Sequence, residues 1–173
     1  MTKKLRLVML LLLGMCLLAV QPGKAKALNS VPADEDFVRN AAKGGKMEVD
    51  LGRLALKRAR SLAVKRFGQR MVTDHTRAGN ELKRLAMRKK IALAMAMDPE
   101  GHAEMERLSK LRGAEFDRAY TDLMVSDHEK DVGEFQNEAD NGADADIKAF
   151  AARTLPTLKT HLSLARAAAA KVK

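Results

Sequence analysis

Apolar residues recur at helical spacing along four long stretches of this chain, and nowhere do apolar and polar residues alternate long enough to predict a strand. The long stretches cover about residues 34–59, 61–89, 114–139 and 144–172, and a shorter helical pattern covers about 98–111. The composition is dominated by alanine, leucine, lysine, arginine and glutamate, which all favour helices. The sequence therefore predicts an all-α fold.

The connections between these stretches predict how the helices assemble. Short joins within each half of the chain give two antiparallel hairpins, and roughly 25 residues separate the hairpins, enough to run the length of a bundle. We predict a ferritin-like four-helix bundle with one long crossover that carries the short helix. We also predict N-caps at Asp34 and Asp98, an end of the short helix at Gly113, a break or kink before Pro156, and close helix packing at Gly44-Gly45.

The first 27 residues have the pattern of a secretory signal peptide. Three basic residues precede an unbroken apolar run over residues 7–20, and Ala25-Lys26-Ala27 is a small-x-small cleavage site. Since a helix needs about 20 residues to span a bilayer, we predict cleavage, with an uncleaved anchor as the alternative. We expect export to the periplasm or cell envelope, with residues 28–173 forming the bundle domain.

Loss of this segment changes the charge and the cysteine content of the protein. The formal net charge is +10 for the whole chain, and removing 1–27 leaves 27 basic against 22 acidic side chains. Cys16, the only cysteine, is also lost, which excludes thiolate ligands and cysteine nucleophiles. Modest charge and few aromatic residues argue against nucleic-acid binding. The basic segments 57–60 and 88–90 are expected to be solvated or to contact anionic lipid.

A five-residue motif occurs twice in the chain. Met71-Val72-Thr73-Asp74-His75 matches Met124-Val125-Ser126-Asp127-His128, and each copy falls near the middle of a predicted helix. Equivalent placement in the two halves indicates an internal duplication.

Helical spacing turns four polar side chains toward the predicted core. His75 and His128 lie on the apolar faces of their helices, His161 lies on or beside the apolar face of the last helix, and Glu48 faces inward from the first. Mid-helix positions of an antiparallel bundle come to one level, so we expect these four side chains to converge.

Buried polar groups are costly unless they are paired, so the convergence allows three interpretations. One is a transition metal bound by imidazoles and a carboxylate. Another is a metal-free network in which Glu48, Asp74 and Asp127 accept hydrogen bonds from the histidines. The third is a rotation of the helices that leaves several of these groups at solvated seams.

For a bound metal, the sequence favours copper or another imidazole-binding divalent ion over a di-iron centre. Di-iron bundles use Glu-x-x-His, whereas Val72, Val125 and Leu158 stand three residues before the histidines. Met71 and Met124 place a thioether one turn from an imidazole, which suits copper, and core packing is the simpler interpretation of both methionines.

Several strings along the chain also carry a resemblance to a known family. They are Phe37-Val38, Gly44-Gly45, Glu48-Val49, Arg70-Met71-Val72-x-Asp74-His75, Phe116-Asp117-x-x-Tyr120, Met124-Val125-x-Asp127-His128 and Leu155-Pro156-x-Leu158-x-x-His161-Leu162. Over residues 34–166 the chain resembles the exported bacterial family called "domain of unknown function 4142". The resemblance implies a ferritin-like bundle without an established activity. The Met-x-x-Asp-His strings are also similar to Met-x-x-His-His elements of small exported copper-binding proteins.

These observations predict an exported bundle that binds a transition metal through Glu48, His75, His128 and His161. A metal-free structural or stress-related envelope protein is the alternative, as is a bundle that binds a partner or a membrane surface. Phosphate-binding loops and zinc-protease motifs are absent from the sequence, so we do not expect an enzyme.

Overall fold

Helices make up most of the chain that the structure describes. The computed structural model describes residues 31–94, 96–97 and 99–172, so the predicted signal peptide and Asp98 lie outside the described residues. The helices are α1 (Val31–Arg58), α2 (Leu62–Lys89), α3 (Pro99–Ser109), α4 (Gly113–Asn141) and α5 (Ala145–Ala170). Within those ranges no strand occurs, and the predicted all-α class is confirmed.

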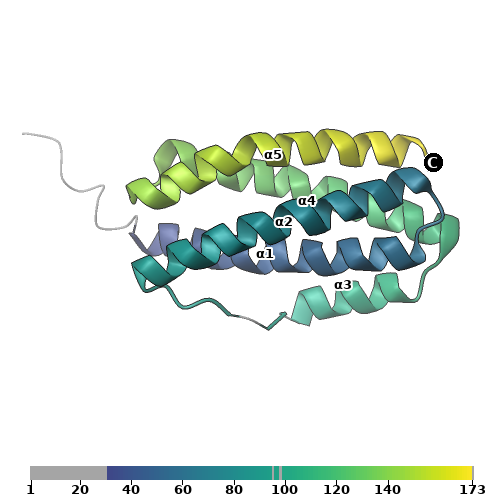
Figure 1. Cartoon of the computed structure of the whole chain (residues 1–173), viewed down its shortest axis with the longest axis horizontal. Coiled ribbons are helices and arrows are strands. Elements are labelled where there is room, and N and C mark those ends of the chain that lie inside the picture. Colours follow the sequence, from purple (N-terminus) through teal and green to yellow (C-terminus); the bar gives the residue numbers. More distant parts are fainter. Residues whose placement is uncertain (1–30, 95, 98, 173) are drawn as a thin grey trace, which may run out of the picture.

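The four long helices form two antiparallel hairpins that lie side by side. α1 packs along α2, and α4 packs along α5 (Figure 1). The connection after α2 returns along the length of the bundle, and α3 lies beside α1 within it (Figure 1). This is the predicted ferritin-like bundle with one long crossover.

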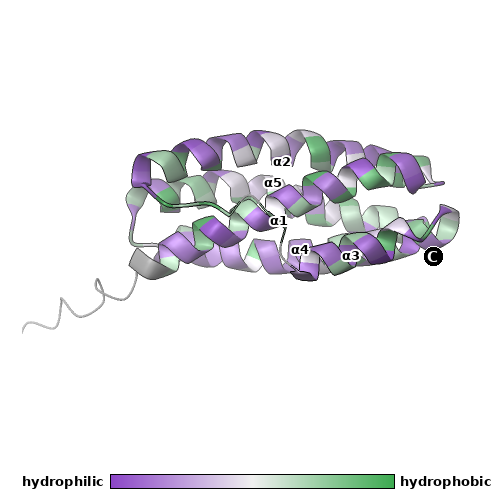
Figure 2. Ribbon diagram, turned by 90° about the horizontal axis from the view of Figure 1, so that it is seen from below, coloured by the Kyte–Doolittle hydropathy of each residue, from purple (hydrophilic) through white to green (hydrophobic). Residues whose placement is uncertain are grey.

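The helices expose one face and bury the other. Hydrophilic and hydrophobic residues alternate along each helix in Figure 2, as expected of helices that cover a common core. In the described part of the chain, none of the helices is both long and apolar enough to cross a membrane.

Two of the predicted helix starts are confirmed by their capping hydrogen bonds. The Ser61 hydroxyl accepts from the Ala63 amide at the start of α2. The Asp144 carboxylate accepts from the Asp146 and Ile147 amides at the start of α5. Each cap satisfies amides that have no partner within the helix.

Other predictions about helix ends are wrong. Asp34 is not an N-cap, because α1 begins at Val31 and the buried Asp34 carboxylate accepts from two amides of the α4–α5 turn. Gly113 does not end α3 but begins α4, with a φ of 58° that suits glycine. Pro156 lies inside α5 without ending it, so a break before Pro156 is wrong, and a kink there stays a prediction.

Close packing between α1 and α2 occurs at glycines other than the predicted pair. A Cβ atom on Gly52 would lie 2.7 Å from the Gly68 carbonyl oxygen, so neither helix leaves room for a side chain there. A Cβ atom on Gly44 would meet nothing within 4 Å, and one on Gly45 would lie 3.7 Å from Nδ1 of His75. Close packing at Gly44-Gly45 is therefore wrong, and Gly45 lies beside an imidazole instead.

Two apolar clusters fill the two ends of the bundle. One is built around Phe37, Leu82, Phe135 and Phe150, and the other around Leu51, Phe67, Phe116 and Tyr120. On each long helix the two clusters are separated along the sequence by buried polar residues, namely Glu48 on α1, Asp74 and His75 on α2, His128 on α4 and His161 on α5. The core is therefore interrupted at mid-length by a polar layer.

Candidate metal centre

The polar layer contains the four side chains that helical spacing predicted to face the core. Glu48 comes from α1, His75 from α2, His128 from α4 and His161 from α5. Their exposed fractions are 2%, 7%, 0% and 1%. The expected convergence of these side chains in the core is therefore confirmed, and the interpretation that placed them at solvated seams is wrong.

The three imidazoles are spaced as ligands of a common ion would be. Each offers a ring nitrogen, and these atoms all lie within 4.8 Å of one another. The ring centroids are 5.7 Å apart for His75 and His128, 5.2 Å for His75 and His161, and 5.4 Å for His128 and His161. Metal–nitrogen bonds of about 2.0–2.1 Å in a tetrahedral site place imidazole centroids about 5.2 Å apart. The centroids fit that spacing, whereas nitrogens bound to one ion lie at most about 4.2 Å apart, so the imidazoles must shift or rotate to share an ion.

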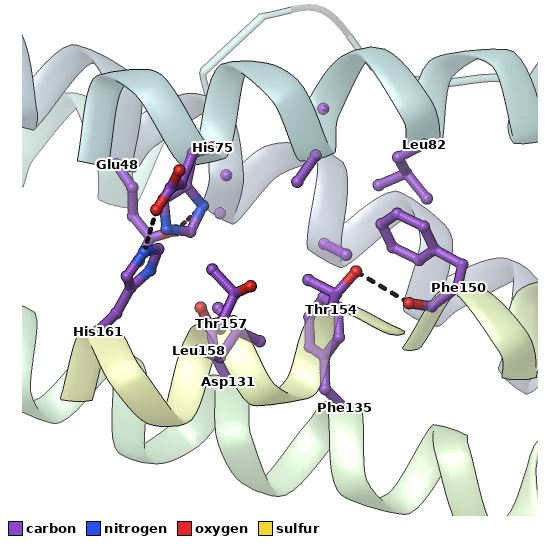
Figure 3. Close-up of a pocket in the computed structure, with 16 residues that line it drawn as sticks. Glu48, His75, Leu82, Asp131, Phe135, Phe150, Thr154, Thr157, Leu158 and His161 are labelled. Atoms are coloured by element: carbon purple, nitrogen blue, oxygen red, sulfur yellow. Dashed lines mark hydrogen bonds and ion pairs between the residues drawn. The ribbon is translucent and has the colours of Figure 1, made fainter. Parts of the chain in front are cut away.

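One nitrogen of each imidazole has a protein partner. His161 donates from Nε2 to the Asp74 carboxylate at 2.9 Å, and His128 donates from Nδ1 to the Met124 carbonyl at 2.9 Å. Nδ1 of His75 forms an ion pair with Glu48 at 2.9 Å (Figure 3). Partners of this kind fix the orientation and tautomer of histidines that bind metals.

The other nitrogen of each imidazole is buried without a hydrogen-bond partner. These atoms are Nε2 of His75, Nε2 of His128 and Nδ1 of His161. An unsatisfied buried polar atom destabilises a fold by about 1–3 kcal/mol, so three such atoms in one layer would strongly destabilise a metal-free core. A single cation would satisfy all three where each imidazole is neutral, since the nitrogen that carries no hydrogen then has a free lone pair.

The carboxylates of the layer set its charge. Burial raises the pKa of Glu48, but the charge and hydrogen bond of His75 and the nearby His128 and His161 outweigh it, and the net shift is downward. Burial also raises the pKa of Asp74, and here hydrogen bonds from His161 and Arg70 reverse the effect. Both groups therefore carry negative charge at neutral pH.

The histidines respond differently to the same layer. Burial lowers the pKa of His161 to about 4 against the opposing effect of Asp74. Burial also lowers the pKa of His128. Burial lowers the pKa of His75 as well. The charge and hydrogen bond of Glu48 raise this pKa by more than burial lowers it, so the net shift is upward. His128 and His161 are therefore neutral at pH 7 and need release no proton to bind a cation.

The flanking residues of the repeated motif do not behave alike. Asp74 joins the histidines, whereas Asp127 is half-buried with no hydrogen bond to them, and its Oδ2 has no partner. The prediction that Asp127 accepts a hydrogen bond from a histidine is therefore wrong. Burial, helped by Glu48, raises the pKa of Asp127 to about 6. Met71 and Met124 are fully buried in the apolar cluster around Tyr120, where they fill the core.

Asp131 is a residue of the layer that the motif search missed. It lies one turn after His128 on α4 and lines a cavity beside Glu48, His75 and His161 (Figure 3). Burial, together with the charge of Glu48, raises its pKa to about 8. The sequence signal was present in the spacing of His128 and Asp131, since residues three apart share a helix face.

Asp131→Asn is expected to raise the melting temperature of the metal-free protein more at pH 8 than at pH 5. In the unfolded chain the carboxyl ionises near its ordinary value of 3.8, whereas the folded protein holds the proton until about pH 8. Its contribution to stability is therefore complete below about pH 4 and declines as pH rises through 8. Thermal unfolding followed by circular dichroism measures the effect. Asp122→Asn, at an exposed position of α4, is the control, and equal shifts at both pH values would contradict the expectation.

A four-helix bundle with a buried polar layer of three histidines and two carboxylates defines a class of helical protein with a candidate metal centre. The family model described as "Domain of unknown function (DUF4142)" matches residues 19–168. The chain therefore belongs to this family, and the resemblance seen in the sequence is confirmed. Among curated proteins, no sequence matches the chain.

Solved structures of similar fold come from proteins of low sequence identity. A DUF305 fragment from Deinococcus radiodurans has a TM-score of 0.71 at 16% identity, covering 81% of this chain and 97% of that one. A candidate secreted DUF305 protein from Streptomyces coelicolor has a TM-score of 0.68 at 17% identity, covering 81% and 92%. CopM in its Cu(II)-bound form has a TM-score of 0.68 at 18% identity, covering 81% and 97%. These likenesses establish the fold.

Proposed function

We propose that this protein is an exported transition-metal-binding protein that holds one copper ion between His75, His128 and His161. The observation that carries the proposal is the set of three buried ring nitrogens, one on each histidine, that lack any hydrogen-bond partner. Buried polar atoms in folded proteins are usually satisfied by a protein group, an ordered water or an ion. Three of them within one layer indicate a cation.

Each of the remaining polar groups has a supporting role in this proposal. Glu48 lies 2.9 Å from Nδ1 of His75 and 3.3 Å from Nδ1 of His128, so it supplies a negative charge next to the ion. Asp74 orients His161 and is itself held by Arg70 at 2.7 Å. Three imidazoles leave one coordination position open, as in metal sites that bind a further ligand.

Copper is favoured over other ions by the donors and by the fold. Imidazole suits copper, zinc, iron and nickel, and copper(II) binds most strongly in the ordinary order of divalent ions. CopM, which shares the fold, has been solved with Cu(I) and with Cu(II). The absence of Glu-x-x-His from the sequence argues against a di-iron centre.

Export is the second part of the proposal. It is supported by the basic and apolar segment over residues 1–27 and by the likeness to a candidate secreted DUF305 protein. A protein outside the cytoplasm that binds copper without a catalytic motif is suited to buffering or carrying the ion.

Metal analysis and thermal unfolding test the function directly. Protein purified without chelators, or titrated after metal removal, is expected to bind one copper ion per chain. Copper at 100 times its dissociation constant is expected to stabilise the fold by about 2.7 kcal/mol. Zinc, manganese and iron are the comparison ions in the same titration. If none of the four ions raises the melting temperature, the metal-free structural alternative holds instead.

A further inference from the structure

A small cavity lies directly beside the three histidines. Its volume is about 40 Å³, and His75, His161, Glu48 and Asp131 form part of its wall (Figure 3). Most of the remaining wall is apolar and comes from all four long helices: Ala41, Ala78, Leu82, Phe135, Phe150 and Leu158. The candidate metal centre is therefore continuous with an internal space that is largely hydrophobic.

The size and the wall of the cavity restrict what it can hold. A single water needs about 10–15 Å³ measured this way, so 40 Å³ has room for a molecule of a few atoms. The polar residues of the wall are Glu48, Asp74, His75, Asp131, Thr154, Thr157 and His161, and the hydroxyl of Thr154 donates to the Phe150 carbonyl at 2.9 Å (Figure 3). A wall whose remaining surface is mostly apolar favours a small uncharged molecule over an ion, and water competes for the space beside the polar groups.

The cavity also lies beside two of the three histidines of the proposed metal site. Nε2 of His75 and Nδ1 of His161 are unpartnered, and both residues belong to the cavity wall. An ion bound by three protein nitrogens keeps an open position for an exogenous ligand. A molecule in the cavity would lie next to that position.

We propose that this cavity binds one small uncharged diatomic molecule, of the chemical class of dioxygen and carbon monoxide, at the open position of the metal. The inference rests on the proposed copper site and names its ligand. The ligand belongs to the reduced ion, since soft Cu(I) is the state that binds such molecules. Binding alone is inferred, without transfer of electrons or atoms.

Carbon monoxide is the probe, because its stretching band reports directly on coordination to Cu(I). Protein loaded with Cu(I) without oxygen is expected to show a single C–O band and one carbon monoxide per copper. Ala78→Leu, which fills the cavity, is expected to weaken carbon monoxide binding by about tenfold or more while one copper per chain is retained. Ala152→Leu, the same change at an exposed position of α5, is the control.

Two further measurements protect the test against a variant that does not fold. Ala41→Leu fills the cavity from α1, whereas Ala78 belongs to α2. Xenon, which enters apolar cavities, is expected to compete with carbon monoxide in the unmodified protein.

Copper binding without a C–O band would overturn this inference and leave the proposed function intact. So would equal carbon monoxide affinity in Ala78→Leu and Ala152→Leu. A chain that binds no copper would overturn both proposals, and copper stoichiometry distinguishes these cases.

Discussion

His128→Leu is expected to abolish stoichiometric copper binding while the metal-free bundle stays folded. His128 is completely buried, and its Nε2 is one of the three unpartnered nitrogens, so leucine removes a ligand together with an unsatisfied polar atom. Changing a residue that merely supports a ligand costs 10- to 100-fold in metal affinity, so loss of the ligand itself is expected to cost at least about 100-fold. Copper titration measures the affinity, and the melting temperature without metal measures the fold.

The sign of the stability change makes this experiment specific. The metal-free variant is expected to melt at or above the temperature of the unmodified protein, because a similar apolar side chain replaces an unsatisfied one. Copper is expected to raise the melting temperature of the unmodified protein only. His102→Leu, on an exposed position of α3, is the matched control and should keep full copper binding. A His128→Leu variant that still binds one copper tightly would contradict the proposed ligand set.

Gly52→Ala is expected to destabilise the bundle strongly, against the ordinary preference of helices for alanine. A Cβ atom at this position would lie 2.7 Å from the Gly68 carbonyl oxygen, which belongs to the backbone and cannot rotate away. Overpacking of this kind costs about 1–3 kcal/mol, and the helices must separate to relieve it. Chemical denaturation is the measurement, with the free energy of unfolding as its result.

Gly133→Ala separates the steric effect from helix propensity. A Cβ atom there would meet nothing within 4 Å, so the same substitution should stabilise α4 by about 0.5–1 kcal/mol. The difference between the two variants then reports the packing at the α1–α2 contact alone. Equal effects of the two substitutions would show that the helices can adjust without cost.

The sequence was sufficient for the architecture because periodicity and connection length depend on local residues. The inward orientation of His75, His128 and His161 followed from their positions on apolar faces, and the helix starts near Ser61 and Asp144 followed from the limits of the helical patterns. Long-range partners could not be predicted in the same way. Asp34 resembles a cap in sequence, yet it accepts hydrogen bonds from amides more than 100 residues away.

The details of the site depended on helix rotation and contact, which periodicity does not define. Asp127 occupies the same place in its motif as Asp74, but only Asp74 is oriented toward an imidazole. Asp131 was missed because the search for carboxylates looked three residues before each histidine and not three after. Gly52 and Gly68 could not be distinguished from other glycines, since a close approach of two helices involves both partners.

Every long helix contributes to the polar layer: Glu48 and His75 come from one hairpin, and His128 and His161 come from the other. Most helix contacts lie within the hairpins rather than between them. An ion held in the layer would therefore act as a cross-link between two units that are otherwise joined by side-chain packing and by one connection. Cells that supply or withhold the ion would then control how long the protein resists unfolding and proteolysis, so that metal availability sets its lifetime.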